Sequence, residues 1–296
     1  MSGGKSARNR KTRIVNLADQ LALGGLIERA LAEDVGLGDV TTAATVRPDA
    51  RGRARIAVKE DEMVLCGGPL IAPIMERCGA QARVASLAAD GAILHRGDIA
   101  AEIEGLLTGL LIGERTALNF MQLMSGIATK TAQFVRAVAG TRARIVDTRK
   151  THPGLRAVEK YAVRMGGGFN HRFGLDSGVL IKDNHIAAAG SLSAAIMLAR
   201  EAVPHTLRIE IECENLAQLE AAIAARADVV LLDNMTLEDI RRACQIAAGR
   251  VQIEVSGNIT LATVGEIART GVDLISVGEL THSARAADLS MRIEAY

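Results

Sequence analysis

The sequence predicts an α/β protein in which a smaller α+β region is followed by a (β/α) barrel with parallel strands. From residue 127 onward, helical patterns alternate with short apolar runs, which is typical of βαβ units. The run Val-Val-Leu-Leu at residues 229–232 is apolar throughout, as expected for a strand covered on both faces. No G-x-G-x-x-G follows the first of these strands. We therefore favour a barrel, closed or incomplete, over a doubly wound sheet.

The composition argues against a general affinity for nucleic acid. Of the 296 residues, 49% are hydrophobic and 23% are charged, which suffices for one large or two medium cores. The net charge is +1, so an anion site must be built locally from gathered cations. Aromatic residues make up 2% and Trp is absent, which argues against stacking platforms for single-stranded nucleic acid.

The cysteines and the apolar runs indicate a cytoplasmic protein. The four cysteines, at positions 66, 78, 213 and 244, show no C-x-x-C pair and no metal-ligand spacing, as expected for reduced thiols. No apolar run reaches about 18 residues, so no transmembrane helix is expected. Residues 1–14 are basic and lack the apolar core of a signal peptide. We expect them to form a flexible tail, with a contact role as the alternative.

The N-terminal domain is expected to span residues 15–126 and to mix helices with short strands. Residues 16–31 form an amphipathic helical pattern, and residues 107–126 a long one that the segment G-E-R-T at 113–116 interrupts. Between them, Gly and Asp separate short β-rich pieces around a single helix. These pieces are residues 54–58, 63–66, 82–86 and 98–103, and the helix is residues 71–78.

The barrel is expected to span residues 127–283, and residues 284–296 to pack back on the N-terminal domain. Pro153 suits the first turn of a helix, and Gly166 suits its left-handed end. The predicted strands are residues 144–147, 179–182, 208–212, 228–233, 251–256 and 273–277. The predicted helices are residues 127–140, 153–165, 191–203, 215–226, 236–248 and 261–270.

Polar residues follow every predicted barrel strand, at the ends where parallel barrels carry their active sites. With the small residues of the last two turns, these strand-end residues are Thr148, Arg149, Lys150, Lys182, Glu212, Asp233, Ser256, Gly257, Asn258, Ser276, Val277 and Gly278. Strands that meet solvent often end in polar residues. That tendency does not account for a lysine at one end, lone carboxylates at two others and small-residue turns at the last pair. The pattern predicts a single site for a strongly anionic ligand.

The cations of this site are expected to bind carboxylate or phosphate. Arg149 and Lys182 follow apolar runs that direct them into the barrel mouth, and the planar guanidinium suits both anions. Lys150 and Arg172 lie close by in the sequence. His171 fits a structural role as well as a ligand contact, because an imidazole both donates and accepts.

The carboxylates and the small residues suggest the rest of the site. Glu212 and Asp233 end successive strands and are candidate ligands of Mg²⁺ or of ribose hydroxyls. Salt bridges to Lys182 or Lys150 are the alternative, because carboxylates inside a barrel need partners. The turns at 256–258 and 276–278 allow backbone N–H groups to approach a phosphate.

Several short motifs occur in an order that resembles one enzyme family. They are GERTALNF (113–120), SGIAT (125–129), DTRKT (147–151), PGLR (153–156), NHR (170–172), LIKDNH (180–185), LLDN (231–234) and LTHS (280–283). With these motifs, the chain resembles the quinolinate phosphoribosyltransferases, also called nicotinate-nucleotide pyrophosphorylases (carboxylating), from about residue 33 to residue 283.

The resemblance implies an N-terminal open α/β sandwich and an incomplete barrel, paired as a homodimer in which Arg115 reaches the partner's active site. It implies transfer of phosphoribosyl from phosphoribosyl pyrophosphate to quinolinate, with decarboxylation, in de novo NAD biosynthesis. The products are nicotinate mononucleotide, pyrophosphate and CO₂, and the reaction uses Mg²⁺. No nucleic acid or membrane partner is implied.

The resemblance also suggests roles for the strand-end residues. Arg115, Arg149, His171 and Arg172 would bind the quinolinate carboxylates, and Lys150 and Lys182 would balance pyrophosphate and substrate charge. Glu212 and Asp233 would hold ribose hydroxyls and Mg²⁺, so these two and the two lysines are the expected catalytic residues. Ser256, Gly257 and Gly278 would bind the 5′-phosphate, with Thr148, Asn258, Ser276 and Val277 as further contacts.

Three positions depart from the family pattern. His152 replaces the second Thr of T-T-P-G-L-R, Asn258 replaces the last Gly of Ser-Gly-Gly, and Glu279 replaces the Ala of Gly-Ala-Leu-Thr-His. A carboxylate at 279 would repel a phosphate if it faced the site. Asn tolerates a left-handed backbone, so the turn at 258 is expected to persist.

Other functions remain open at this point. The first is a related phosphoribosyltransferase with another acceptor, such as nicotinate, or one of the molybdenum-transport-associated relatives. The second is a barrel lyase that uses Lys150 or Lys182 as a Schiff base. A non-enzymatic scaffold fits least, because it has no use for converging polar strand ends.

Overall fold

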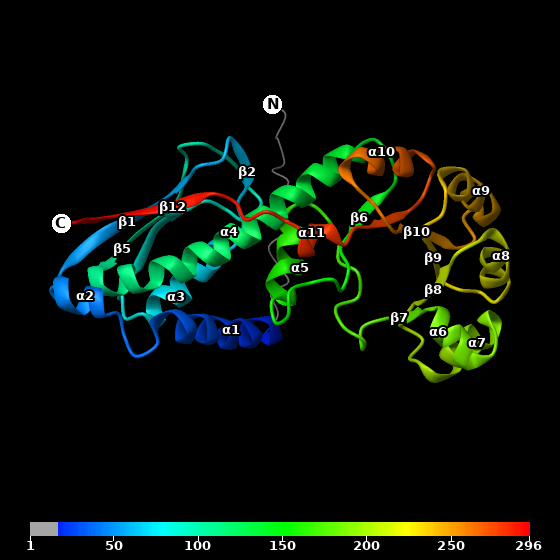
Figure 1. The fold of residues 1–296 in the computed structure, drawn as a ribbon, viewed down its shortest axis with the longest axis horizontal. Coiled ribbons are helices and arrows are strands. Elements are labelled where there is room, and N and C mark those ends of the chain that lie inside the picture. Colours follow the sequence, from blue (N-terminus) through cyan, green and yellow to red (C-terminus); the bar gives the residue numbers. More distant parts are fainter. Residues whose placement is uncertain (1–16) are drawn as a thin grey trace, which may run out of the picture. The chain divides into compact units, whose positions relative to one another are not determined.

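The computed structural model describes residues 17–296, so the predicted basic tail lies outside the described residues (Figure 1). The chain divides into two compact units. The first contains the described residues up to Ser125 together with Ala286–Tyr296, and the second is Gly126–Arg285. Within the described residues, no helix is long and apolar enough to cross a membrane.

The first unit is built on a four-stranded sheet with the order β12-β1-β5-β3. A short ladder of β2 and β4 lies apart from it, and β12 pairs antiparallel with β1. The elements are α1 (Leu17–Val35), α2 (Val40–Thr45), β1 (Arg51–Val58), β2 (Glu62–Val64), η2 (Gly68–Leu70), α3 (Ile71–Arg77), β3 (Arg83–Leu87), β4 (Ile93–His95), β5 (Ile99–Leu106) and β12 (Leu289–Ala295).

Alternation along β1 explains why this sheet has one buried face. Residues from 52 to 58 at every second position are buried, among them Ile56 and Val58, while Arg53 and Arg55 point outward. Arg53 pairs with Glu104 of β5 at 2.8 Å, and Arg55 pairs with Glu102 at 2.7 Å. Opposite charges directly across the ladder therefore reinforce the register set by the buried face.

Helix α4 (Leu107–Ala137) corrects two predictions: residues 113–116 do not interrupt it, and the helix predicted over residues 127–140 is its continuation and not a separate element. The glycines of this helix allow close packing against neighbouring residues, and they do not break the helix. A Cβ on Gly109 would overlap the backbone of Ala80, and a Cβ on Gly113 would lie 2.9 Å from Met75 Sδ. The glycines therefore let the segment around α3 approach the helix closely, at a cost in helix propensity of roughly 1 kcal/mol each.

The second unit contains a six-stranded parallel sheet with the order β6-β11-β10-β9-β8-β7. Each strand lies beside its successor in the chain except β6 and β7, and the last strand pairs with the first through Ile275 and Ile145. Pairing of last with first is the closure of a (β/α) barrel, and the gap between β6 and β7 leaves it incomplete. The predicted fold class is thus confirmed, and in Figure 1 α8, α9 and α10 lie outside the strands.

Most predicted barrel elements are present, with corrections at both ends of one helix and one additional helix. Helix α5 begins at Arg156, so Pro153 lies before it. Gly167, with φ +90°, takes the left-handed conformation expected at Gly166. An unpredicted helix, α6, follows β7 directly. The elements are β6 (Arg144–Val146), α5 (Arg156–Met165), β7 (Val179–Ile181), α6 (Asp183–Ala189), α7 (Leu192–Ala202), β8 (Ile209–Cys213), α8 (Leu216–Ala224), β9 (Val229–Asp233), α9 (Leu237–Ala247), β10 (Gln252–Ser256), α10 (Leu261–Arg269), β11 (Leu274–Ser276) and α11 (Glu279–His282).

Candidate active site

A buried ion pair organises the carboxyl end of β6. Asp147 and Lys160 of α5 form this pair, and Asp147 Oδ2 accepts a hydrogen bond from Asn170 Nδ2 at 2.6 Å. The backbone N–H of His171 donates to Asp147 Oδ1 at 2.9 Å. Burial raises the pKa of Asp147 and lowers the pKa of Lys160, so desolvation outweighs the attraction between them. The pair joins β6, α5 and the 170–172 segment into one framework.

His171 has both ring nitrogens engaged within the protein. Its Nδ1 accepts a hydrogen bond from the backbone N–H of Arg172 at 2.7 Å. Its Nε2 lies 3.0 Å from Glu210 Oε2 and 3.7 Å from Glu254 Oε1. Burial works against the charged imidazolium, but the two carboxylates outweigh burial and raise the pKa of His171. This orientation favours the structural alternative and leaves no ring nitrogen for a substrate carboxylate.

The guanidinium of Arg172 has a buried N–H donor that is not hydrogen-bonded. Its Nη1 donates to the Gly178 carbonyl at 3.1 Å, while its Nε is buried and has no hydrogen-bond partner. Burial lowers the pKa of Arg172, and the charge of Arg149 lowers it further. Two guanidiniums that repel each other, one with an orphaned buried donor, are suited to an anion with several acceptor oxygens.

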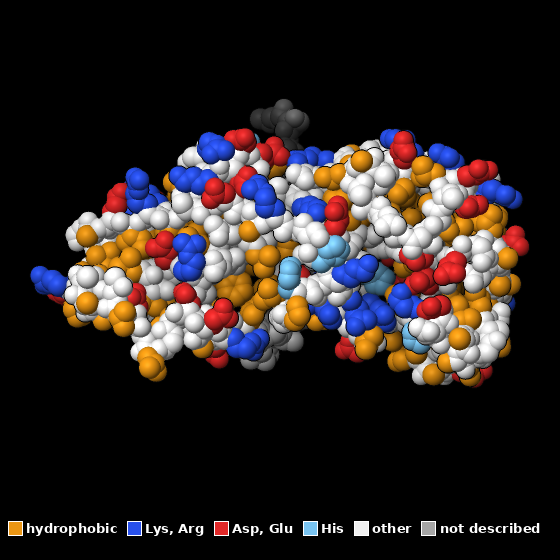
Figure 2. Space-filling view, in the orientation of Figure 1, with side chains coloured by type: hydrophobic (Ala, Val, Ile, Leu, Met, Phe, Trp, Pro, Cys, Tyr) orange, Lys and Arg blue, Asp and Glu red, His pale blue; other side chains and the backbone are white. Residues whose placement is uncertain are grey.

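At the ends of the other strands, the predicted polar residues form ion pairs and hydrogen bonds with one another. Lys182 Nζ forms an ion pair with Glu212, which was the alternative to a metal-binding role for this carboxylate. Asp233 accepts hydrogen bonds from Ser256 Oγ at 2.7 Å and from Asn234 Nδ2 at 2.8 Å. In Figure 2, Lys, Arg and His side chains gather between α5 and β7, with Asp and Glu side chains next to them over β8 and β9.

The small-residue turn after β11 differs from what the sequence predicts. Ser276 is buried and its hydroxyl donates to the Val255 carbonyl at 3.3 Å, while the Val277 N–H donates to the Val146 carbonyl at 2.9 Å. Both groups are therefore used inside the sheet and do not face a ligand. A Cβ on Gly257 would overlap Asn234 Oδ1, and a Cβ on Gly278 would lie 3.0 Å from Lys150 Cδ. These two glycines allow the close packing of the turns.

The three departures from the family pattern each find a local partner. His152 Nδ1 lies 2.5 Å from the buried carboxylate of Glu159, near the start of α5. Asn258 has φ +50° and donates to Asn234 Oδ1 at 3.2 Å, so the left-handed turn persists. Glu279 forms an ion pair with Lys130 at 3.2 Å. The charge at position 279 is thereby offset within the protein.

The remaining predicted residues lie at exposed or half-buried positions. Thr148 Oγ1 accepts a hydrogen bond from the Lys150 backbone N–H at 3.0 Å, which shapes the turn after β6. The side chains of Arg149 and Lys150 are exposed, and the Lys150 carbonyl accepts a hydrogen bond from Thr281 Oγ1 at 2.7 Å. Arg115 is exposed on α4, in the first unit.

The sequence did not reveal four buried residues that fix the positions of the site residues. They are Asp147 as an acceptor, Lys160, Glu210 as a buried group, and Glu254. A signal was present for Glu254, which lies between Ile253 and Val255 in a predicted strand; the burial of Lys160 is evident only in the structure. A charged residue in such a run is almost never fully buried unless it is paired.

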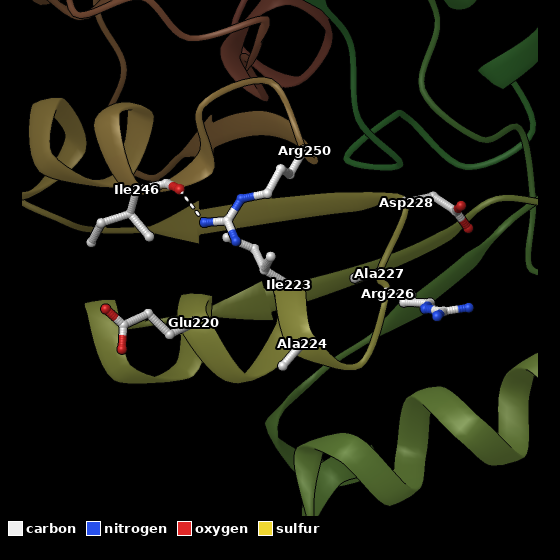
Figure 3. Close-up of a pocket in the computed structure, with 8 residues that line it drawn as sticks. All are labelled: Glu220, Ile223, Ala224, Arg226, Ala227, Asp228, Ile246 and Arg250. Atoms are coloured by element: carbon white, nitrogen blue, oxygen red, sulfur yellow. Dashed lines mark hydrogen bonds between the residues drawn. The ribbon is translucent and has the colours of Figure 1, made fainter.

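A separate open pocket of about 600 Å³ lies at the opposite ends of the strands (Figure 3). Asp228 precedes β9 and Arg250 precedes β10, so both mark the amino ends. Arg250 Nη2 donates to the carbonyl of Ile246, shown as a dashed line in Figure 3. Barrel enzymes place their chemistry at the carboxyl ends, so this pocket lies apart from the candidate site.

The fold and the site define a (β/α)-barrel protein that gathers cations and small-residue turns at the carboxyl ends of its strands. Two family models match the chain. The quinolinate phosphoribosyl transferase N-terminal domain matches residues 39–125, and the quinolinate phosphoribosyl transferase C-terminal domain matches residues 127–292. The chain belongs to the quinolinate phosphoribosyl transferase family.

Individual relatives agree with this assignment. A Bacillus subtilis protein named probable nicotinate-nucleotide pyrophosphorylase (carboxylating) is 42% identical over 275 residues, which cover 93% of this chain and 94% of that protein. A nicotinate-nucleotide pyrophosphorylase (carboxylating) of Mycobacterium leprae is 43% identical over 270 residues, with 90% and 95% covered. The crystal structure of NadC from Streptococcus pyogenes has 41% identity and a TM-score of 0.90, with 93% and 98% covered.

Proposed function

We propose that this chain transfers the phosphoribosyl group of phosphoribosyl pyrophosphate to the ring nitrogen of quinolinate, with decarboxylation, in de novo NAD biosynthesis. The products are nicotinate mononucleotide, pyrophosphate and CO₂, so the enzyme is a pentosyltransferase. The family and the names of its relatives support the proposal. The observation that carries it is the buried Nε of Arg172, a donor without an acceptor beside a second guanidinium.

Quinolinate carries two carboxylates on neighbouring ring carbons, and its subsite must offset both charges. Arg172 and Arg149 take these carboxylates in our proposal, because their mutual repulsion is relieved when a dianion lies between them. Arg115 of a partner subunit completes the subsite. His171 was also predicted to touch quinolinate, but its ring nitrogens serve Arg172 and Glu210, so we assign it a supporting position.

The phosphoribosyl subsite lies along the other strand ends. Lys150 and Lys182 balance the charge of the pyrophosphate, and Glu212 and Asp233 accept hydrogen bonds from ribose hydroxyls. The turn of Ser256, Gly257 and Asn258, together with Gly278, holds the 5′-phosphate. Exposed lysines and half-buried carboxylates at one edge of a sheet support this arrangement.

Mg²⁺ fits this site as an ion held mainly by the substrate. Both oxygens of Asp233 already accept hydrogen bonds, and Glu212 is paired with Lys182. Carboxylate oxygens retain further lone pairs, and Mg²⁺ usually takes one or two carboxylates beside phosphate oxygens and waters. Bound there, the ion would neutralise charge on the departing pyrophosphate.

The protein's part in the chemistry is to position the substrates and to stabilise charge. The bond between ribose C1 and the pyrophosphate oxygen breaks, positive charge builds on the sugar, and the quinolinate nitrogen attacks C1. Lys150 and Lys182 stabilise the leaving group. The C2 carboxylate then leaves as CO₂, and the carbanion that remains lies beside the cationic ring nitrogen and takes up a proton. The substrate therefore stabilises this last step largely by itself.

We further propose that the enzyme is a cytoplasmic homodimer. Its four cysteines are free, as in proteins of a reducing compartment. Arg115 is exposed on α4, so its guanidinium is accessible to a second subunit. Leu37 and Val40 are also fully or largely exposed, which suits a surface that a partner covers.

The test is release of labelled CO₂ from carboxyl-labelled quinolinate, with a strict requirement for phosphoribosyl pyrophosphate. Turnover of nicotinate without CO₂ would instead identify a related phosphoribosyltransferase. Borohydride trapping of a carbonyl substrate on Lys150 or Lys182 would identify the lyase alternative. The ion pair of Lys182 with Glu212 argues against that alternative, because a Schiff base forms from the free amine.

A further inference from the structure

Two carboxyl groups lie buried inside the barrel, below the candidate site. Glu210 of β8 and Glu254 of β10 flank β9, facing Val229 and Leu231 in its ladders. The Glu210 side chain is 10% exposed and the Glu254 side chain 2% exposed. Neither is needed by the reaction described above.

The cluster of His171, Glu210 and Glu254 has more buried acceptor atoms than protons to bond them, and one further proton would complete it. His171 Nδ1 accepts from the Arg172 N–H, so in this geometry the single ring proton is on Nε2. That proton points to Glu210 Oε2 at 3.0 Å, while Glu254 Oε1 is 3.7 Å from Nε2. Oε1 of Glu210 and Oε1 of Glu254 are both buried without a hydrogen-bond partner. The Ser276 hydroxyl also hydrogen-bonds Glu254 but carries no charge, so nothing offsets the repulsion between two adjacent buried carboxylates, and they cannot both remain charged.

We propose that Glu254 carries a carboxyl proton at neutral pH and donates it to Glu210, so that the pair orients His171 and, through it, the backbone of Arg172. Glu254 and Glu210 are then positioning residues for a substrate-binding cation. The inference rests on the proposed function only in assigning a quinolinate carboxylate to Arg172.

The proton belongs to Glu254 because this side chain is the more deeply buried and is farther from the imidazole. The groups that face it are Glu210 of β8, His171 and Ser276 of β11. Burial, followed by the charge of Glu210, raises the pKa of Glu254 to about 8. With Glu254 neutral, the cluster keeps a single negative charge, on Glu210, next to the Nε2–H of His171.

A metal ion is the other group that a His-Glu-Glu cluster can hold, since the three ligand atoms lie within 4.8 Å of one another. The separation of 3.0 Å between His171 Nε2 and Glu210 Oε2 suits a direct hydrogen bond. A proton on Glu254 would also give the unpartnered Oε1 atoms of Glu210 and Glu254 a shared hydrogen bond, and no metal ion is needed to explain them.

Infrared spectroscopy tests the proton directly. At pH 7 the wild-type enzyme is expected to show the C=O band of a protonated carboxyl group, and Glu254→Gln is expected to lack it. Glu220→Gln, a change at an exposed glutamate of α8, should leave the band in place. A band that persists in Glu254→Gln, or is absent from the wild type, overturns the proposal. So does a stoichiometric metal in the purified wild type that Glu254→Gln loses.

Kinetics test the positioning role. Glu254→Gln keeps a neutral donor of the same shape, so its KM for quinolinate should stay within about threefold of the wild type. Glu254→Ala should raise this KM by about tenfold, which corresponds to 1.4 kcal/mol, and leave the KM for phosphoribosyl pyrophosphate within about twofold. Equal effects of Gln and Ala, or equal effects on both KM values, overturn the proposal. If the wild type does not use quinolinate at all, the proposed function fails, and the infrared result still decides the proton.

Discussion

The backbone N–H of His171 donates a hydrogen bond to the buried carboxylate of Asp147 at 2.9 Å. This bond ties the 170–172 segment, which carries Arg172, to the strand end that carries Arg149 and Lys150. Asp147 also pairs with Lys160, whose Nζ donates to the His171 carbonyl at 3.2 Å. Both the N–H and the carbonyl of His171 are thus held by one ion pair, and we expect the position of the proposed substrate-binding cations to depend on it.

Asp147→Asn is therefore expected to destabilise the fold by about 3–5 kcal/mol, because it leaves the buried ammonium of Lys160 without a counter-charge. Adding Lys160→Met should recover part of this loss. Urea unfolding measures both effects. Asp49→Asn, which removes an exposed ion pair with Arg47, should cost less than about 1 kcal/mol. A loss in Asp147→Asn no larger than in Asp49→Asn would contradict the organising role of the pair.

The alternation of helices and strands after residue 127 predicted βαβ units, and the absence of G-x-G-x-x-G after the first strand favoured a barrel. The strand-end rule located Lys182, Glu212, Asp233 and Ser256 at one edge. The continuity of α4 was not predictable, because Gly109 and Gly113 look like helix breakers until the packing against Ala80 and Met75 is seen. Local sequence contains no information on such tertiary contacts.

The site was predicted less completely than the fold for a similar reason. The strand-end rule singled out Glu212, but it did not reveal that Glu210, two residues earlier, is buried, or which partner each carboxylate has. Val277 looked like a phosphate donor because it follows a strand. Its N–H is instead bonded to Val146, and that depends on β6 being the neighbour of β11.

Arg172→Ala and Lys150→Ala should each reduce kcat/KM for quinolinate far more than they lower Tm. Loss of hydrogen bonds to a charged group costs about 1.5–3 kcal/mol, which is roughly a 10- to 100-fold loss of kcat/KM. Steady-state kinetics and thermal unfolding provide the comparison. Arg96→Ala, at an exposed residue of the first unit, is the control and should change neither quantity. Parallel losses of activity and stability would favour a purely structural role for these cations.

Gly257→Ala should raise the KM for phosphoribosyl pyrophosphate. Gly257 has φ +92°, and the added methyl group would displace Asn234 from the turn beside the proposed 5′-phosphate site. Gly249→Ala is a matched control, because its φ is +78° but nothing lies within 4 Å of the added Cβ. The two variants share the backbone strain, so the difference between them isolates the crowding. Equal KM values for phosphoribosyl pyrophosphate in both variants would argue against a phosphate at this turn.

The buried carboxyl of Glu254 predicts a stability that falls as the pH rises. Its pKa is raised from 4.5 to about 8, so between these values the unfolded chain loses a proton that the folded chain keeps. Stability then declines with pH in this window, by at most about 1.4 kcal/mol per unit. Glu254→Gln cannot ionise and should decline less between pH 5 and pH 8, as measured by urea unfolding. Identical declines in the two proteins would show that Glu254 titrates normally.

Mixing two inactive variants tests whether Arg115 acts across a subunit interface. Arg115→Ala removes a residue of the first unit, and Lys150→Ala removes one of the second. If each active site takes Arg115 from one subunit and Lys150 from the other, a mixed dimer contains one site with both residues intact. Exchange of the two variants under mild denaturation and refolding should restore about a quarter of wild-type activity, since half of the dimers are mixed and each has one working site. Mixtures that remain as inactive as the separate variants would place both residues in the same subunit's site. Arg115→Ala mixed with itself provides the baseline, because every site in that sample lacks the guanidinium.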